Sequence, residues 1–533
     1  MNPVSSADHS VSPPFIDVPR DYNAAHDLIE RNLRAGRAEK IAYVDDTGSY
    51  TFGELAERVN RCANALLELG LQHEQRILLC LHDTIDFPTA FLGSIKAGLV
   101  PVAVNTLLKS TDYQYILRDS RARALIVSAA LLPEFEPLFD TLPFLKHVIV
   151  SQGKRAEYHS FAALLAHSRD RCEPAATCAD DACFWLYSSG STGAPKGTIH
   201  VQASMIQTAE LYARPILGIH ADDVIFSAPK LFFAYGLGNS LSFPLAVGAT
   251  TVLMAERPTP DSVVARLRRH SPTIFCGVPT LYASMLSSTL PTRDELRLRT
   301  CVSAGEALPR DLGERWSRHF GVDIIDGLGS TEMLHIFLSN RPDDVCYGTT
   351  GSAVPGYQLR LLDEHGSPVA AGQIGELHVA GPTAALGYWN NREKSRHTFQ
   401  GAWVRSGDQY YVNDTGRYVH AGRSDDMLKV SGLFVSPVEV ESALIAHPAV
   451  LEAAVIGRTD DGGLTKPFAY IVLKSNVEPC TQLAEELKRY VKPRLAAYKC
   501  PRWIEFLPDL PKTATGKIQR FRLREQISPQ PTT

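Results

Sequence analysis

The first strong pattern of hydrophobic and polar positions lies in residues 51–71, where apolar side chains return every three or four residues. This period predicts an amphipathic helix. The apolar residues expected to share one face are Leu55, Val59, Ala63, Leu66 and Leu67. Thr51 and Glu54 have the spacing of a capping box, in which each side chain accepts from the other's backbone N–H, so the helix is expected to begin there.

Short apolar runs indicate buried β-strands. They are RILLCL (residues 76–81), RALIVS (123–128), HVIVS (147–151), TTVLM (250–254), TIFCG (273–277), TCVSAG (300–305) and DIIDGLG (323–329). Helical segments separate them, and this alternation predicts an α/β fold of parallel sheets covered by helices on both faces. Ligands bind beyond the carboxyl ends of the strands in such sheets.

The pattern changes after about residue 345. Residues 357–381 have the strand, glycine turn, strand pattern of a β-meander, and residues 408–423 indicate a hairpin that turns at 413–416. Residues 422–432 are dense in charged and small residues and indicate a linker. Ser436 is a suitable N-cap for a new helix, so the tail is expected to form a small α+β domain.

Composition narrows the class of protein. The chain has 533 residues, 44% hydrophobic and 21% charged, as expected for a soluble globular protein with several domains or subdomains. A net charge of −4 gives no field that favours nucleic acid, and no apolar run reaches membrane-spanning length. Residues 1–20 are expected to be a disordered lead-in and not a secretory signal. Ten scattered cysteines without a C-x-x-C pair indicate reduced core residues in a cytoplasmic protein, with no zinc site.

The stretch YSSGSTGAPKG (residues 187–197) combines small hydroxyl residues, glycines and one lysine. Glycines let backbone N–H groups approach an anion, hydroxyls donate further hydrogen bonds and lysine supplies positive charge. The stretch therefore predicts a phosphate-binding loop. It does not match the Walker P-loop, because Pro195 and Gly197 stand where that motif needs glycine and a hydroxyl. A flexible Gly/Ser linker is the alternative.

Three other elements point to the same chemistry. In GSTE, Thr331 is suited to donate to a phosphate and Glu332 to ligate Mg²⁺. In SGD, Asp408 is suited to accept from both ribose hydroxyls. In PKTATGKIQR, Lys517 follows two small residues near the C-terminus. Each element alone is more often structural, and only their occurrence together is specific.

With these motifs the chain resembles the adenylate-forming acyl-CoA synthetases from about residue 20 onward. The matching signatures are YSSGSTGAPKG, SAGE, DGLGSTE, RSGD, GRSDDMLKVSG and PKTATGKIQR. The resemblance implies a large N-terminal domain (21–422) of parallel-sheet subdomains plus a distorted β-barrel subdomain. It also implies a hinge (423–427) and a small mobile α+β C-terminal domain (428–533). A carboxylate would attack the α-phosphorus of ATP, and the thiol of coenzyme A would then displace AMP.

The resemblance also implies roles for individual residues. Lys517 would neutralise charge at the α-phosphate, Thr331 would contact that phosphate and Glu332 would hold Mg²⁺. The residues expected to hold the β- and γ-phosphates are Ser188, Ser189, Gly190, Ser191, Thr192, Gly193 and Lys196. Those expected around the adenosine are Ser303, Ala304, Gly305, Glu306, Asp326, Gly327, Asp408 and Arg423.

In this family the C-terminal domain swings about a hinge that matches Asp425. The swing would bring Lys429, Ser431 and Gly432 to the coenzyme A tunnel. Residues 481–525 carry a surplus of six basic over acidic residues (11 Lys and Arg, 5 Asp and Glu). This surplus is either a solvated helix face or a contact surface for the phosphates of coenzyme A.

Within the superfamily, residues 230–239 and 329–340 look like the benzoate–CoA ligases. The residues at the acid-pocket positions are Phe233, Ala234, Tyr235, Gly236, Gly329, His335 and Ile336. Aromatic walls and glycines suit a flat ring better than an alkyl chain. His335 is expected either to hydrogen-bond the acid or to fill a wall.

Benzoate is therefore the expected acid, and hydroxy-, amino- and fluorobenzoates are close alternatives. An enzyme that loads a separate carrier protein and a luciferase-like oxygenase share the first half-reaction and remain open. The expected small-molecule partners are an aryl carboxylate, ATP, Mg²⁺ and coenzyme A, with no nucleic acid or membrane partner. The protein is expected to be a monomer or homodimer.

Overall fold

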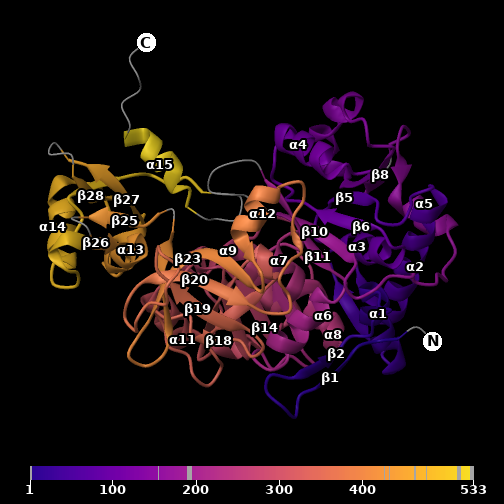
Figure 1. Ribbon diagram of the computed structural model, residues 1–533, viewed down its shortest axis with the longest axis horizontal. Coiled ribbons are helices and arrows are strands. Elements are labelled where there is room, and N and C mark those ends of the chain that lie inside the picture. Colours follow the sequence, from indigo (N-terminus) through magenta and orange to yellow (C-terminus); the bar gives the residue numbers. More distant parts are fainter. Residues whose placement is uncertain are drawn as a thin grey trace.

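The computed structural model describes residues 3–153, 155–188, 195–424, 426–430, 433–460, 464–475, 477–512 and 518–527. Figure 1 shows a large body that contains the chain up to β24 and a small part at one end that contains α13–α15 and β25–β28. The large N-terminal and small C-terminal parts that the sequence predicts are therefore both present.

The first sheet of the large body has eight strands. In sheet order they are β21 (Gly387–Tyr388), β11 (Lys196–Val201), β10 (Ala182–Ser188), β6 (Val100–Ala103), β5 (Arg76–Cys80), β7 (Ala124–Ser128), β8 (His147–Ser151) and β9 (His159–Ser160). The strands from β10 to β9 are parallel, and β11 and β21 extend one edge in antiparallel pairing. Every residue of β7 is buried, as expected of a strand covered on both faces.

The second sheet has nine strands. In sheet order they are β18 (Ser352–Ala353), β17 (Ile336–Ser339), β16 (Ile324–Gly329), β15 (Thr300–Ala304), β14 (Ile274–Gly277), β12 (Val224–Ser227), β13 (Thr250–Val252), β3 (Ile41–Val44) and β4 (Ser49–Thr51). The strands from β16 to β3 are parallel, and both edges are antiparallel. All seven apolar runs in the sequence lie on strands of these two sheets, so the predicted parallel-sheet architecture is confirmed.

Helices connect and cover these strands. They are α1 (Ala24–Arg34), α2 (Phe52–Glu68), α3 (Asp86–Lys96), α4 (Ser110–Ser120), α5 (Phe161–His167), α6 (Ser204–Thr208), α7 (Ala234–Leu237), α8 (Phe243–Val247), α9 (Pro260–His270), α10 (Pro279–Leu286), α11 (Arg310–Phe320) and α12 (Arg392–Thr398). Short 3₁₀ or π turns are η1 (Ala129–Glu134), η2 (Glu136–Thr141), η3 (Ala209–Ala213), η4 (Gly238–Ser242), η5 (Arg293–Glu295), η6 (Thr331–Met333) and η7 (Ala497–Lys499).

Helix α2 begins where the capping box predicts. The Glu54 N–H donates to the Thr51 hydroxyl at 3.1 Å, and the Thr51 N–H donates to the Glu54 carboxylate at 2.7 Å. Leu55, Val59, Ala63 and Leu66 are buried as predicted, whereas Leu67 is 43% exposed. Leu67 lies about 100° around the helix from Leu66 and therefore falls at the edge of the buried stripe.

A third, antiparallel sheet follows the two large ones. Its strands are β19 (Gln358–Leu362), β20 (Gly375–Ala380), β23 (Trp403–Val412), β22 (Phe399–Gln400) and β24 (Tyr418–Arg423). The β23–β24 hairpin turns where the sequence predicts, and the Gly416 N–H donates to the Asn413 carbonyl at 2.9 Å. These strands pair in the order β19, β20, β23 and β22, and β24 also pairs with β23; this is the part of the chain for which the sequence predicts the distorted β-barrel subdomain.

The C-terminal part has the predicted α+β composition. Its elements are β25 (Leu428–Val430), β26 (Leu433–Val435), α13 (Pro437–Ile445), β27 (Val450–Thr459), β28 (Thr465–Leu473), α14 (Thr481–Val491), β29 (Trp503–Phe506) and α15 (Arg520–Ile527). Ser436 caps α13 as predicted, since its hydroxyl accepts from the Glu439 N–H at 3.0 Å. Asp426 forms ion pairs with Arg520 at 3.4 Å and Arg524 at 2.5 Å, which ties the linker to α15.

The predicted disorder of residues 1–20 does not hold for the described part of this segment. Strands β1 (Ser6–Asp8) and β2 (Phe15–Asp17) pair as an antiparallel ribbon. The Ser5 hydroxyl donates to the buried Asp27 carboxylate at 2.6 Å, and His9 lies 2.7 Å from Glu210. These partners lie far along the chain, so the polar sequence of the segment gave no sign of them.

Candidate functional site

The first group of site residues joins two strands of the first sheet. Lys196 begins β11 and Tyr388 ends β21, and the two strands are paired. The Tyr388 hydroxyl donates to a Glu332 carboxylate oxygen at 2.7 Å. The Lys196 ammonium lies 3.4 Å from the same hydroxyl and 4.4 Å from the centre of the tyrosine ring. Burial lowers the pKa of Lys196 while the charge of Glu332 opposes the shift, so a cation and a carboxylate share this corner.

A buried histidine that the sequence did not indicate forms a hydrogen bond with the backbone of the GSTE segment. Thr331 and Glu332 lie in η6, and the Thr331 carbonyl accepts from His200 Nε2 at 2.8 Å. His200 is fully buried and stacks on Phe184 at 5.2 Å. Burial lowers the pKa of His200 to about 4, so the imidazole is neutral and Nε2 carries its proton. His200 follows Lys196 by four positions on one strand, and this same-face spacing was the available signal.

The residues predicted for adenine meet at the carboxyl ends of two parallel strands. β15 and β16 pair with Ser303 opposite Asp326 and Ala304 opposite Gly327. Gly305 follows with φ +93°, a conformation that favours glycine. Burial raises the pKa of the Asp326 carboxyl well above its usual range. The charges of Glu441 and Asp426, and less strongly that of Glu306, raise the pKa of Arg520 against the effect of burial, so Arg520 of α15 lies near this edge.

The residues predicted for ribose lie opposite each other on the β23–β24 hairpin. Asp408 and Arg423 are register partners, and the Arg423 guanidinium donates to the Asp408 carboxylate at 3.1 Å. His420 Nε2 lies 3.5 Å from the same carboxylate oxygen. Gly407 has φ +74°, and a Cβ there would lie 2.8 Å from an Arg423 nitrogen, so this position needs glycine. The pair presents carboxylate and guanidinium groups suited to hydroxyl recognition.

The residues predicted for the acid pocket form an aromatic group around His335. Phe233, Ala234 and Tyr235 are partly buried against the main core at the start of α7. The ring centres of Tyr235 and His335 are 5.6 Å apart, and His335 Nε2 lies 3.3 Å from the Tyr235 carbonyl. His335 is 3% exposed, and burial lowers its pKa to about 3, so it forms a neutral wall. Its Nδ1 has no hydrogen-bond partner among the described residues and is left as an acceptor.

Glycines allow the close packing of this wall. A Cβ on Gly329 would lie 2.6 Å from the His335 carbonyl oxygen, and one on Gly236 would lie 2.0 Å from the Lys230 carbonyl oxygen. A Cβ on Gly238 would lie 2.3 Å from a ring carbon of His335. Ile336 is buried at the start of β17, next to the wall. The predicted pocket residues are therefore neighbours in space, and Gly238 joins them.

A buried carboxylate supports the start of the aromatic segment. Both oxygens of Asp83 accept from the Leu231 N–H, at 3.2 and 3.3 Å. Asp83 is 3% exposed, and burial raises its pKa to about 6 while the charge of Lys230 opposes the shift. Asp83 lies just after β5 of the first sheet, so it connects that sheet to the segment that carries the pocket.

Several predicted site residues lie wholly or partly outside the described part of the chain. Ser188 ends β10, and Lys429 lies in β25 with its side chain outside the description. The predicted residues outside the described ranges are Ser189, Gly190, Ser191, Thr192, Gly193, Asp425, Ser431, Gly432 and Lys517.

Two further observations concern the described ranges only. No cluster of three or more His, Cys, Asp or Glu side chains there is arranged to hold a metal ion. None of the helices in those ranges has the length and apolar character needed to cross a membrane.

Comparison with known proteins agrees with the geometry. Residues 29–389 match the family model described as AMP-binding enzyme, and residues 439–517 match that of its C-terminal domain. The benzoate–CoA ligase of Thauera aromatica is 64% identical over 98% of this chain and 100% of its own length. A 4-hydroxybenzoate–CoA/benzoate–CoA ligase of Rhodopseudomonas palustris is 50% identical over 95% of this chain and 94% of its own length.

The crystal structure of a benzoate CoA ligase from Burkholderia xenovorans LB400 superposes with a TM-score of 0.89 at 56% identity, and the match covers 94% of this chain and 100% of that one. Two matched domains, full-length relatives and a shared fold lead to one conclusion: this chain belongs to the family of AMP-binding enzymes.

Proposed function

We propose that the protein joins benzoate to coenzyme A at the expense of ATP, through a benzoyl-adenylate, with release of pyrophosphate and AMP. The observation that carries the proposal is the neutral aromatic wall of Tyr235 and His335 beside the nucleotide motifs. A flat, uncharged ring fits such a wall, while the acid's carboxylate faces the phosphate-binding residues. The full-length similarity to benzoate–CoA ligases supports the same substrate.

In the first half-reaction, a benzoate oxygen attacks the α-phosphorus of ATP and the bond to pyrophosphate breaks. Negative charge gathers around phosphorus, so preorganised cations and donors lower the barrier. We assign Lys517 to the α-phosphate and the attacking carboxylate, and Lys196 with the loop from Ser188 to Gly193 to the β- and γ-phosphates. Thr331 donates to the α-phosphate, and its position depends on the hydrogen bond from His200 to its carbonyl.

The nucleoside is assigned to the two strand edges described above. Asp408 accepts from the ribose hydroxyls, and Arg423 holds that carboxylate in place. The adenine lies along residues 303–306, with Asp326 and Gly327 on the adjacent strand. The site therefore collects residues from β15, β16 and the β23–β24 hairpin.

Glu332 fits a magnesium ion that arrives with the nucleotide. Its carboxylate is half-buried and accepts a hydrogen bond from the neutral Tyr388 hydroxyl, which leaves oxygen lone pairs for a hard cation. Mg²⁺ commonly uses one or two carboxylates plus substrate phosphates, so a single glutamate is sufficient. The ion would offset the charge of the phosphate chain.

In the second half-reaction, the thiol of coenzyme A attacks the benzoyl carbon and AMP leaves. We propose that residues 423–427 act as the hinge between the domains 21–422 and 428–533, with Asp425 at its centre. Lys429, Ser431 and Gly432 would then face the pantetheine tunnel. The ion pairs of Asp426 with Arg520 and Arg524 support this proposal, because they anchor one end of the hinge to the C-terminal part.

We further propose that the enzyme works in the cytoplasm as a monomer or homodimer. All ten cysteines are free in the structure, and five of them, including Cys62 and Cys276, are buried in the core as reduced thiols commonly are. Neither partner proteins nor a membrane enter the proposed reaction.

The deciding experiment measures AMP release that depends on ATP, Mg²⁺ and coenzyme A across a panel of acids. The panel contains benzoate, hydroxy- and aminobenzoates, cinnamate, cyclohexanecarboxylate, hexanoate and acetate. A maximum kcat/KM with benzoate and detection of benzoyl-CoA support the proposal. A maximum with a straight-chain acid contradicts the aryl pocket. Adenylate formation without transfer to free coenzyme A would instead favour an enzyme that loads a carrier protein.

A further inference from the structure

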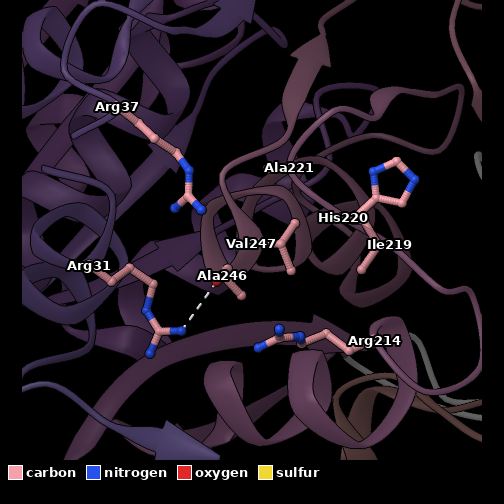
Figure 2. Close-up of a pocket in the computed structure, with 8 residues that line it drawn as sticks. All are labelled: Arg31, Arg37, Arg214, Ile219, His220, Ala221, Ala246 and Val247. Atoms are coloured by element: carbon pink, nitrogen blue, oxygen red, sulfur yellow. Dashed lines mark hydrogen bonds between the residues drawn. The ribbon is translucent and has the colours of Figure 1, made fainter. Parts of the chain in front are cut away.

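A cavity lies where α1, α8 and the segment before β12 meet. Its volume is about 250 Å³. Figure 2 shows the arginine side chains pointing toward the space between these elements. The lining residues are Arg31, Arg37, Arg214, Ile219, His220, Ala221, Ala246 and Val247. None of them belongs to the motifs assigned to ATP, coenzyme A or the acid, so the cavity is separate from the adenylate site.

Two buried carboxylates already form ion pairs with the arginines of the cavity. Arg31 pairs with the fully buried Asp27 at 2.8 Å and lies 3.6 Å from Glu210. Glu210 also accepts from His9 at 2.7 Å and lies 3.4 Å from Arg214. Both acids are 3% exposed or less in their side chains and do not line the cavity, so they offset part of the charge of Arg31 and Arg214 without occupying it.

Arg37 has no carboxylate partner within the described ranges. Its guanidinium donates to the amide oxygen of Asn32 at 3.2 Å. Its stem lies against Gly248, where φ is +84° and an added Cβ would be 2.6 Å from the Arg37 Cδ. The close contact fixes the direction of the side chain, so one full positive charge is held at the cavity without a neutralising acid.

A neighbouring lysine adds to this excess of positive charge. The Lys40 ammonium donates to the carbonyls of Ala221 and, at 2.6 Å, of Gly248. Burial lowers the pKa of Lys40, the nearby Asp222 opposes that shift, and the charge of Arg37 lowers the pKa further. Lys40 and Arg31 already satisfy the carbonyls at the end of α8, so Arg37 and Arg214 are not required as caps of that helix.

The size and donor set of the cavity indicate its ligand. The volume equals about eight water molecules at ~30 Å³ each, which is below the ~300 Å³ at which pockets for larger organic ligands begin. Guanidinium forks favour oxyanions that accept several hydrogen bonds at once, and a phosphate group offers three or more acceptor oxygens. We propose that this cavity binds a phosphate group, either as inorganic phosphate or as a small phosphate monoester, between Arg37, Arg214 and Arg31.

The test is equilibrium dialysis of the full-length protein with radiolabelled inorganic phosphate, in the presence of excess ATP and Mg²⁺ to occupy the nucleotide site. Arg37→Gln keeps the stem over Gly248 but removes the charge. We expect it to weaken phosphate binding about tenfold or more, as loss of charge-assisted hydrogen bonds does. The control is Arg34→Gln, since Arg34 pairs with Glu30 on the same helix and lies outside the cavity lining.

A second variant protects the test against a folding defect. Arg214 has a 44% exposed side chain, so Arg214→Gln should fold normally and also weaken phosphate binding. Unlabelled glycerol phosphate added as a competitor distinguishes the two sources, because it displaces the label only if a monoester fits. Equal phosphate affinity in wild type, Arg37→Gln and Arg214→Gln would overturn the proposal. The outcome does not depend on which acid the enzyme activates.

Discussion

The hydroxyl of Tyr388 provides the sharpest test of the proposed adenylation site. It donates to the Glu332 carboxylate at 2.7 Å and lies 3.4 Å from the Lys196 ammonium. Tyr388→Phe removes this oxygen but keeps the ring, and therefore the 4.4 Å contact between the ammonium and the ring. Glu332 then loses the hydrogen bond that holds its carboxylate in place.

A hydrogen bond to a charged group contributes about 1.5–3 kcal/mol. At ~1.4 kcal/mol per factor of ten, its loss corresponds to a ten- to hundredfold reduction if the bond acts fully in the transition state. We expect a reduction of this size in kcat/KM for ATP and a higher Mg²⁺ concentration at half-maximal rate. The assay is benzoate-dependent exchange of label between pyrophosphate and ATP, with Mg²⁺ titrated at fixed ATP.

Tyr347→Phe is the matched control, because the Tyr347 hydroxyl donates to Asp323 at 2.8 Å at the opposite end of β16. It should lower stability without changing the Mg²⁺ response. Thioester formation from added benzoyl-adenylate and coenzyme A should be nearly unchanged in Tyr388→Phe. An exchange rate and Mg²⁺ response equal to wild type would refute the role of the Tyr388 hydroxyl.

Substitutions at three other positions probe the remaining contacts. Gly238→Ala places a methyl group 2.3 Å from the His335 ring. Overpacking of about 1–3 kcal/mol should raise KM for benzoate about five- to hundredfold, while KM for ATP changes little. Equal changes in the two KM values would contradict a local effect. His200→Leu removes the hydrogen-bond donor to the Thr331 carbonyl and should slow pyrophosphate exchange about tenfold. His200→Gln can restore the donor and part of the rate. Equal rates in the two variants would mean that packing alone matters. Burial raises the pKa of Asp83 from 3.8 to about 6, so the native state binds this proton more tightly than the unfolded state, and the stabilisation present below pH 3.8 is lost as pH rises through 6. Urea unfolding should therefore show Asp83→Asn gaining about 2 kcal/mol relative to wild type between pH 4 and pH 7, and a constant difference would show that the carboxyl titrates normally.

The strand pattern, the helix caps and the hairpin turn could be predicted because they depend on neighbours in sequence. The capping box of Thr51 and Glu54, the N-cap Ser436 and the turn at residues 413–416 each involve residues two to four apart, and all three are present. The apolar runs became strands of two sheets because continuous burial requires cover on both faces. The predicted lead-in failed because its contacts, such as His9 with Glu210, join residues about 200 positions apart.

The chemical types at the site were determined by the sequence: a loop of small hydroxyl residues with one lysine, the Thr331–Glu332 pair, and an aromatic segment beside glycines. Only the tertiary structure decided which side chains support them. The supporting side chains come from other strands and loops. They are His200, which bonds the Thr331 carbonyl, Tyr388, which bonds the Glu332 carboxylate, and Asp83, which bonds the Leu231 N–H. Such contacts depend on the order of strands in each sheet and on the distance between strand ends. The local pattern of hydrophobic and polar residues determines neither.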